Sequence, residues 1–246
     1  MDLVSVIIPY YKKRKFILET LDSAINQSYK SLEIIIIYDD VNKTDIEFLR
    51  KIAKKDNRIK IIENREKMGA GISRNIGISK SKGKYIAFLD ADDIWQLDKL
   101  KKQINFMEEY KFFISHTSYS IINENKNIIG KRIAKNFFEL SELLKSCDIG
   151  TSTVVIHKNL INHNIKFASL STKEDFVLWL RILKNNVSIY GLNEDLALWT
   201  KSQNSLSSST FQKIIDGFRV YYTYMNFGFI KSVYYLICLS INFLKK

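Results

Sequence analysis

Four short apolar runs, separated by segments with helical periodicity, constrain most strongly how this chain can fold. The runs are rich in β-branched residues, which favour strands over helices. Each run is also too short for a helix of ordinary length. We therefore predict four strands in the first part of the chain, at Val4–Ile8, Leu32–Ile37, Ile59–Ile62 and Tyr85–Leu89.

Amphipathic helices are expected between these strands. In the first connecting segment, Ile17, Leu21 and Ile25 recur at the spacing that places side chains on one helix face. The expected helices cover residues 14–27, 44–56 and 69–79. Strands that alternate with helices favour a parallel sheet with right-handed crossover connections. The predicted fold class is α/β, with a single Rossmann-like sheet covered by helices on both faces.

Polar residues follow three of the predicted strands at the point where each strand ends. They are Pro9 to Tyr11, the pair Asp39 and Asp40, and the segment from Asp90 to Asp93. The carboxyl ends of parallel strands meet at one edge of the sheet, where open α/β sheets bind their ligands. The sequence therefore predicts a nucleotide-binding crevice at this edge.

The acidic segment after the fourth strand favours a metal–diphosphate site. Asp90 and Asp92 are two residues apart, so in an extended chain they point the same way. A hard divalent cation bound by one or two carboxylates usually takes its other ligands from water and phosphate oxygens. The alternative is helix capping, with Asp93 as the cap of a helix that begins near Ile94.

The pattern is looser after Trp95. We expect helices from Leu97 to about Met107, over 138–146 and from Phe176 to Leu183, and strands at 112–122, 151–157, 189–192 and 196–200. From Gly217 the chain is rich in aromatic residues.

Composition supports a globular protein with few linkers. Of the 246 residues, 46% are apolar and 26% charged, with one proline and nine glycines. Two cysteines without metal or disulfide spacing fit a reducing, cytoplasmic setting. The first residues lead directly into a strand rather than a basic leader, so no signal peptide is expected. The three histidines, His116, His157 and His163, do not form a zinc-type pattern.

A net charge of +12 attracts anions without specifying which. Nucleotide phosphates, anionic lipid headgroups and nucleic acid all carry the required charge. The lysines are scattered, and the sequence has no basic-region helix, RNA-binding aromatic strand or zinc finger. Nucleic acid is therefore not an expected partner.

Five segments, in this order, resemble the motifs of family 2 glycosyltransferases. The resemblance extends from residue 3 to about residue 210. It implies a bacterial-type, inverting enzyme with a GT-A fold. The segments are Val4–Tyr11, Asp39–Asp40, Gly69–Gly77, Asp90–Asp93 and Glu174–Asp175.

The resemblance also implies an organisation. Residues 1–215 would form the glycosyltransferase domain, with a nucleotide-sugar half at 1–110 and an acceptor half at 111–215. Residues 216–246 would form a C-terminal helical tail.

The resemblance assigns nucleotide-binding roles to residues of the first half. The chain departs from the family's usual Asp-Asp-Gly-Ser, because Val41 and Asn42 follow the acidic pair. Either Asp39 or Asp40 would read the uracil N–H, and we favour Asp40. The segment from Gly69 is not a dinucleotide fingerprint, because the last glycine is missing and no strand leads directly into it. The implied nucleotide-binding residues are Pro9, Tyr11, Asp39, Asp40, Lys67, Arg74, Asp90 and Ala91.

It also implies the chemistry. Asp92, helped by Asp90, would hold Mn²⁺ or Mg²⁺ against the diphosphate, and Asp175 would be the general base. Acidic residues that offset the dipole at a helix start are the alternative for Asp175. Glu174, Trp179 and Lys201 would contact the acceptor, although packing in the core is the favoured interpretation of Trp179. Ser202 stands near where the family often has a histidine.

The tail has two interpretations. Its longest uncharged stretch, Ser232 to Leu244, is too short to span a bilayer, but tyrosines beside lysines suit an interfacial helix on anionic lipid. Packing on the catalytic core or in a dimer is the other interpretation. We expect a cytoplasmic protein, peripheral on the inner face of the cytoplasmic membrane if the first holds.

The expected activity is metal-dependent, inverting transfer of a hexose or N-acetylhexosamine. The donor would be a UDP-sugar, and the acceptor a saccharide or lipid-linked glycan used in bacterial surface polysaccharide or lipooligosaccharide assembly. The alternatives are a non-catalytic protein that keeps the fold and binds glycan or lipid, and a sugar nucleotidyltransferase.

Overall fold

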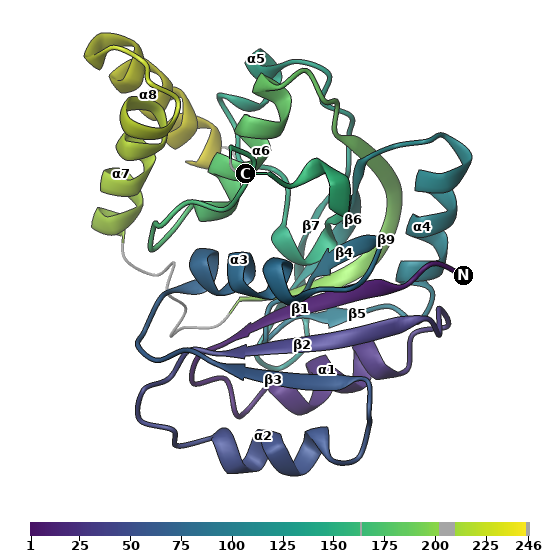
Figure 1. Ribbon diagram of the computed structural model, residues 1–246. Helices are drawn as coiled ribbons and strands as arrows, with labels where there is room; N and C mark the ends of the chain where they lie inside the picture. Colours follow the sequence, from purple (N-terminus) through teal and green to yellow (C-terminus); the bar gives the residue numbers. More distant parts are fainter. Residues whose placement is uncertain (163, 202–209, 245–246) are drawn as a thin grey trace.

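The computed structural model describes residues 1–162, 164–201 and 210–244. In these residues nine strands form one sheet, in the order β3-β2-β1-β4-β8-β6-β9-β5 with β7 paired to β6. Helices cover both faces of the sheet (Figure 1). The α/β prediction with a single sheet is confirmed.

The first half is parallel, as predicted. Each strand pairs in parallel with its neighbour in the order β3-β2-β1-β4. Three helices connect the strands in sequence. The elements are β1 (Val4–Tyr10), α1 (Ile17–Ile25), β2 (Leu32–Tyr38), α2 (Ile46–Ala53), β3 (Ile59–Glu63), α3 (Ala70–Lys80) and β4 (Tyr85–Phe88).

Alternate residues of the central strands enter two different cores. Val6 and Ile8 of β1 pack with α1 and α2, whereas Ile7 packs with Ile78 of α3 on the other face. Successive strand side chains point to opposite faces, so a strand buried on both sides must be apolar throughout. Burial on both faces explains why the run at Val4–Ile8 is nearly continuous rather than alternating.

The second half is mixed. Strand β8 pairs antiparallel with both β4 and β6, and β9 runs parallel to β6. The elements are β5 (Ile94–Trp95), α4 (Lys99–Glu109), β6 (Ile114–Asn123), β7 (Ile128–Arg132), α5 (Leu140–Leu143), a 3₁₀ turn (Thr151–Thr153), β8 (Val155–His157), a second 3₁₀ turn (Lys158–Leu160), α6 (Glu174–Lys184) and β9 (Tyr190–Lys201).

Several predicted elements of this half need correction. The strands expected at 189–192 and 196–200 are one strand, β9, whose pairing with β6 shifts register twice between Thr117 and Tyr119. The sequence did not predict β5 or β7. Ile94 lies in β5 rather than in a helix, so Asp93 is not a helix cap.

The tail is helical, with α7 (Thr210–Arg219), a π-helical turn (Val220–Tyr224) and α8 (Phe229–Leu244). The turn is anchored to the core: Tyr221 is fully buried, and its hydroxyl donates to the carbonyl of Leu144 at 2.6 Å. Figure 1 shows α7 and α8 at one end of the molecule, beside α6. Helix α7 is continuous across the proposed boundary at residue 215, and the division into domains remains a proposal.

Candidate active site

A cavity of about 370 Å³ opens at the carboxyl ends of β1, β2 and β4. It lies at the edge that the sequence predicted for ligand binding. Ten of the predicted site residues line it: Pro9, Tyr11, Asp39, Lys67, Arg74, Asp90, Ala91, Asp92, Glu174 and Asp175. Asp40, Trp179 and Lys201 do not.

Asp39 fixes the loop that precedes α3. Its carboxylate accepts hydrogen bonds from the backbone N–H groups of Met68 and Gly69 at 2.7 and 2.8 Å, and from the side chain of Asn64 at 2.8 Å. Gly69 has a φ of 82°, a conformation that glycine adopts without strain. Asp39 therefore shapes the cavity wall as well as lining it.

Asp40 is buried and does not line the cavity. One of its oxygens accepts from the N–H of Asn42 at 3.2 Å, and the other is buried without a hydrogen-bond partner among the described residues. The preference for Asp40 as the residue that reads the base is not supported, because Asp39 is the member of the pair that reaches the cavity.

Tyr11 and Lys67 meet at the same end of the cavity. The Lys67 ammonium lies 4.1 Å from the centre of the Tyr11 ring, within the range of a cation–π contact. The cavity thus offers the aromatic ring of Tyr11, on which a base can stack, beside the ammonium of Lys67, which can bind an anion.

Arg74 is buried and forms ion pairs with two carboxylates. Its guanidinium donates to Asp90 at 2.5 Å and to Glu174 at 2.7 Å, and its side chain is 3% exposed. Burial opposes the charged form, but the two carboxylates outweigh it and raise the pKa of Arg74. The sequence predicted that Arg74 faces the nucleotide; in the structure it joins α3 to the strand-end acid and to α6.

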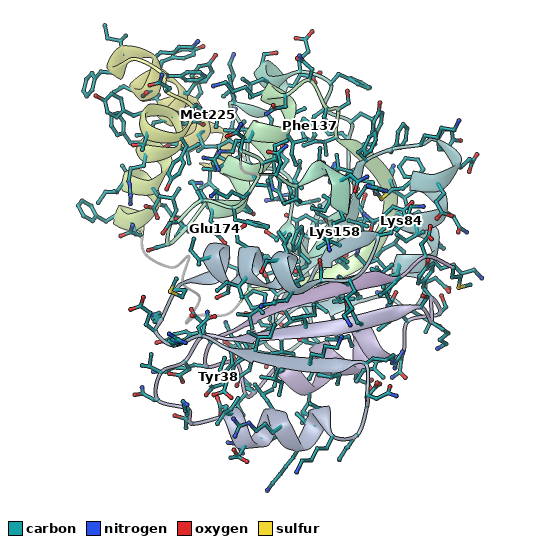
Figure 2. All side chains as sticks on the ribbon, viewed as in Figure 1. Tyr38, Lys84, Phe137, Lys158, Glu174 and Met225 are labelled. Carbon is teal, nitrogen blue, oxygen red and sulfur yellow. The ribbon has the colours of Figure 1, made fainter. Side chains whose placement is uncertain are left out.

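Glu174 is the second carboxylate that pairs with Arg74. It is the first residue of α6 and lies beside α3 (Figure 2). Burial raises the pKa of its carboxyl to about 7, opposed by Arg74 and reinforced by the neighbouring Asp175. A buried ion pair costs desolvation energy and is retained where its geometry is needed. Here it fixes the start of α6, where Asp175 lies.

The approach of α3 to α6 requires a glycine at position 71. A Cβ at Gly71 would lie 2.4 Å from the carbonyl oxygen of Ala168 and 2.9 Å from Cγ of Glu174. The glycine in this motif therefore allows close packing of the helices behind the cavity.

The strand-end acids have different environments. Asp92 pairs with Lys13 at 2.6 Å; burial raises the pKa of Asp92, and Lys13 opposes the rise. Asp93 is fully buried and accepts hydrogen bonds from the hydroxyl of Ser152 and the N–H of Thr200. Only Asp90 and Asp92 face the cavity, while Asp93 ties the acidic segment to β9.

The donor set fits a hard divalent cation that is completed by a ligand. Asp90 and Asp92 supply two carboxylates, and across the described ranges no group of three or more histidine, cysteine and acidic side chains forms a metal cage. Mg²⁺ and similar ions are commonly held by one or two carboxylates plus phosphate oxygens and water. Lys13 and Arg74 neutralise the two acids in the present arrangement.

Asp175 is oriented by two hydrogen bonds. One oxygen accepts from the hydroxyl of Thr151 at 2.7 Å, and the other accepts from the N–H of Phe176 at 2.7 Å. The preceding Lys173 has a φ of 62°, the left-handed conformation that is unusual outside glycine. The carboxylate thus lines the cavity with its direction fixed.

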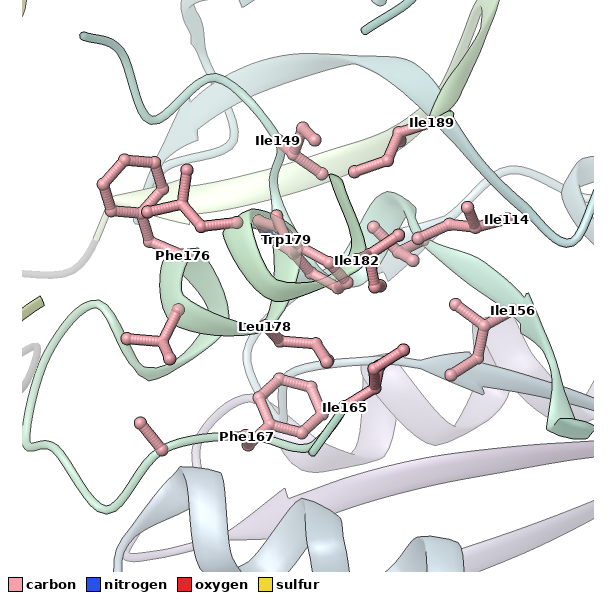
Figure 3. Close-up of a cluster of buried hydrophobic side chains, with 14 of the residues drawn as sticks. Ile114, Ile149, Ile156, Ile165, Phe167, Phe176, Leu178, Trp179, Ile182 and Ile189 are labelled. Atoms are coloured by element: carbon pink, nitrogen blue, oxygen red, sulfur yellow. The ribbon is translucent and has the colours of Figure 1, made fainter. Parts of the chain in front are cut away.

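Two of the weaker assignments do not reach the cavity. Trp179 is fully buried among apolar side chains, with Phe167 packed against it edge-on (Figure 3), so it packs in the core, the interpretation favoured from the sequence, and does not line the cavity. Lys201 is exposed and lies outside the cavity lining. Ser202 lies outside the described residues.

Several residues that line the cavity were not predicted from the sequence. Lys13 follows the first strand, and its place at the same sheet edge was a usable signal. The others come from β6, β9, the first 3₁₀ turn, the segment before α6 and helix α7, which only tertiary contacts bring together. They include Tyr119, Thr151, Lys173, Trp199 and Lys213.

Comparison with known proteins agrees with this architecture. The model of the family described as "Glycosyl transferase family 2" matches residues 5–165. A putative teichuronic acid biosynthesis glycosyltransferase, TuaG of Bacillus subtilis, is 34% identical over 245 residues, which cover 99% of this chain and 97% of that protein. The UDP-Glc:alpha-D-GlcNAc-diphosphoundecaprenol beta-1,3-glucosyltransferase WfgD of Escherichia coli is 36% identical over 214 residues, 86% of this chain and 82% of that protein.

Among solved structures, the S. aureus protein TarS (residues 1–349) in complex with UDP-GlcNAc has a TM-score of 0.71 and 19% sequence identity. The match covers 97% of this chain and 71% of that one. At this identity the likeness concerns the fold. The sequence matches and the shared architecture lead to one conclusion: the chain belongs to glycosyl transferase family 2 and is a glycosyltransferase with the GT-A fold.

Proposed function

We propose that this protein transfers a hexose or N-acetylhexosamine from a UDP-sugar to a saccharide or lipid-linked glycan acceptor. The transfer would serve the assembly of a bacterial surface polysaccharide or lipopolysaccharide. One observation carries the proposal: Asp39, the pair Asp90 and Asp92, and Asp175 all line a single cavity at the sheet edge. A base-reading acid, a diphosphate-binding pair and a general base are the parts that such a transfer requires.

The donor end would be formed by Tyr11, Asp39 and Lys67. A uracil ring would stack on Tyr11, and a free lone pair of Asp39 would accept its N–H. The name of the WfgD relative gives UDP-Glc as its donor, and the TarS structure holds UDP-GlcNAc. Both support a UDP-sugar here.

Asp90 and Asp92 would hold Mn²⁺ or Mg²⁺. When bound, the cation stabilises the negative charge that develops on the departing diphosphate. Lys13 and Arg74 contact the same two carboxylates and would keep the acids paired when no donor is bound.

Asp175 would act as the general base. Its carboxylate takes the proton of the acceptor hydroxyl while that oxygen forms a bond to the anomeric carbon. The bond from the anomeric carbon to the diphosphate oxygen breaks, and its electron pair leaves with UDP. A single displacement of this kind inverts the anomeric configuration. Thr151 would keep the accepting oxygen directed at the acceptor.

The tail would place the enzyme on an anionic membrane surface. Helices α7 and α8 expose large apolar side chains that include Phe211, Phe229 and Ile230, with Lys231 beside them. Aromatic residues with flanking lysines suit the interfacial region of a bilayer. Among the described helices, none combines the length and apolar character needed to cross a membrane.

Thermal-shift titration with UDP, GDP, CMP and dTDP, with and without Mn²⁺, tests the proposal. A ligand that binds only the folded protein raises its melting temperature. We expect a shift with UDP that requires Mn²⁺ and is lost in Asp92→Ala. Lys101→Met, an exposed change on α4, serves as the control and should leave the shift intact. The absence of a shift with any nucleotide would contradict the UDP-sugar proposal.

A further inference from the structure

Two further lysines line the cavity. Lys173 immediately precedes the Glu174–Asp175 pair, and Lys213 lies on α7. Neither forms an ion pair with a carboxylate in the part of the chain that the structure describes. By contrast, Lys13 and Arg74 at the strand-end acids are both paired.

Helix α7 builds this part of the cavity. The buried carboxylate of Asp216 accepts hydrogen bonds from the N–H and the hydroxyl of Thr172, at 2.9 and 3.1 Å. The stem of Lys173 lies beside Gly217 of α7: a Cβ built at Gly217 would lie 3.7 Å from Cε of Lys173, an ordinary van der Waals distance. The segment that carries Lys173 is therefore held against α7, next to the general base.

Positive charge is concentrated here. Partial burial lowers the pKa of Lys213, and the nearby charges of Lys173 and Lys201 lower it further. An anion bound beside Lys213 would offset the repulsion that it experiences from these two neighbouring cations. In the proposed transfer the diphosphate of the donor is bound at Asp90 and Asp92. The lysines would therefore bind a second anionic group.

We propose that Lys173 and Lys213 bind a phosphate or diphosphate carried by the acceptor, at its anomeric carbon. The inference rests on the proposed transfer and names the class of its acceptor. A hydroxyl of a pyranose is separated from the anomeric phosphate of the same sugar by only part of the ring. A base that deprotonates that hydroxyl and cations that bind that phosphate must therefore lie in one cavity, and Asp175 and Lys173 both line the cavity here.

The apolar part of such an acceptor would lie on the tail. The Lys213 ammonium is 5.5 Å from the centre of the Phe243 ring, and Phe243 of α8 is 67% exposed. Phe211, two residues before Lys213, is also exposed. A lipid diphosphate bound at the lysines would therefore meet exposed aromatic surface directly outside the cavity.

The test measures binding of farnesyl diphosphate, inorganic pyrophosphate and farnesol to the full chain in the presence of saturating UDP and Mn²⁺. UDP blocks the donor site, so any remaining diphosphate binding reports a second site. We expect farnesyl diphosphate to bind more tightly than pyrophosphate, and farnesol not to bind measurably. Loss of a hydrogen bond to a charged group predicts about tenfold weaker farnesyl diphosphate binding in Lys173→Met and in Lys213→Met. The arginine variants at the same positions should retain most of the affinity.

UDP binding distinguishes this inference from the proposed function. Lys173→Met and Lys213→Met should change UDP affinity less than twofold, and Lys101→Met should change neither ligand. If UDP binds but farnesyl diphosphate and pyrophosphate do not, the acceptor-phosphate site is wrong and the donor proposal stands. If the lysine variants lose UDP and farnesyl diphosphate in parallel, the lysines belong to the donor site. Failure of UDP to bind the wild type would instead contradict the proposed function.

Discussion

Individual side chains at the cavity are held by partners from distant parts of the chain. Asp175 is directed by Thr151, and Glu174 by Arg74, one hundred positions earlier in the sequence. Such preorganisation is what a general base requires, because its carboxylate must lie within hydrogen-bond reach of the proton that it takes.

Asp175→Asn tests the base assignment. The amide keeps the size and the contact with Thr151 but cannot accept a proton at neutral pH. We expect kcat to fall by about two to four orders of magnitude, the usual contribution of general base catalysis, while UDP binding is retained. UDP release from candidate UDP-sugars measures the rate, and thermal shift measures the binding. A variant that keeps its activity would remove Asp175 from the mechanism.

Lys99 provides a residue-scale test of stability against pH. It is fully buried on α4, and its ammonium donates to Gln103 at 2.8 Å and lies 4.3 Å from the Trp95 ring. Burial lowers the pKa of Lys99 to about 7. Between pH 7 and the ordinary lysine pKa, the unfolded chain binds more protons than the folded one, so this residue makes stability rise with pH.

Denaturant unfolding at pH 7 and 9 should reveal this rise in the wild type. Relative to Lys99→Met, the free energy of unfolding of the wild type should increase by up to about 1.4 kcal/mol per pH unit. Lys101→Met, which changes an exposed lysine of the same helix, should follow the wild type. A constant difference between the wild type and Lys99→Met would show that the buried ammonium does not titrate in this range.

At the scale of elements, the cavity depends on three close approaches. Helix α3 meets α6 across Gly71, α7 holds the segment before α6 through Asp216, and the acidic segment is tied to β9 through Asp93. Each contact joins parts of the chain that are far apart in the sequence. Asp175 and the strand-end acids therefore share one cavity only when these elements are docked.

Gly71→Ala tests the first approach. A methyl group there would lie 2.4 Å from a backbone oxygen, which cannot move away as a flexible side chain can. Overpacking of this kind costs about 1–3 kcal/mol, more than the helix propensity gained by replacing glycine. We expect a lower melting temperature and lower UDP affinity. Gly228→Ala is the matched control, because its Cβ would have no neighbour within 4 Å, and it should be close to neutral.

For the whole molecule, the tail gives one end an unusual surface. Ile230 is 85% exposed and Phe229 is 66% exposed, although the other side of the tail is anchored in the core through Tyr221. Exposed apolar side chains grouped in this way mark an interaction surface. The proposed lipid-linked acceptor would make a membrane the expected partner of this surface.

Cosedimentation with phosphatidylglycerol vesicles tests whether the tail binds an anionic membrane surface. Burying a large apolar side chain contributes about 1.5–3 kcal/mol, so replacing Phe229 and Ile230 together by asparagine should reduce the bound fraction at least tenfold. High salt should weaken the binding of the wild type by screening its positive charge. Ile128→Asn, at a 69% exposed position on β7, controls for general hydrophobicity. Equal pelleting of all variants would contradict a membrane role for the tail.

Local sequence patterns were sufficient to predict the parallel half of the sheet and the edge at which the cavity lies. Those features depend on local patterns: β-branched runs, helical spacing, and polar residues where strands end. Together with the resemblance to family 2 glycosyltransferases, these patterns predicted ten of the cavity residues, from Pro9 to Asp175.

Only the tertiary structure decided which of these residues face one another. In the folded protein Asp39 lines the cavity and Asp40 does not. Trp179 is buried in the core, and Arg74 forms an ion pair with Asp90. The tertiary structure also added Thr151, Lys173 and Lys213, whose positions depend on mixed strand pairing and on α7 docking. No local pattern encodes these choices, because they depend on contacts between residues far apart in the chain, and each contact forms only when the complete fold offsets the entropy of ordering both partners.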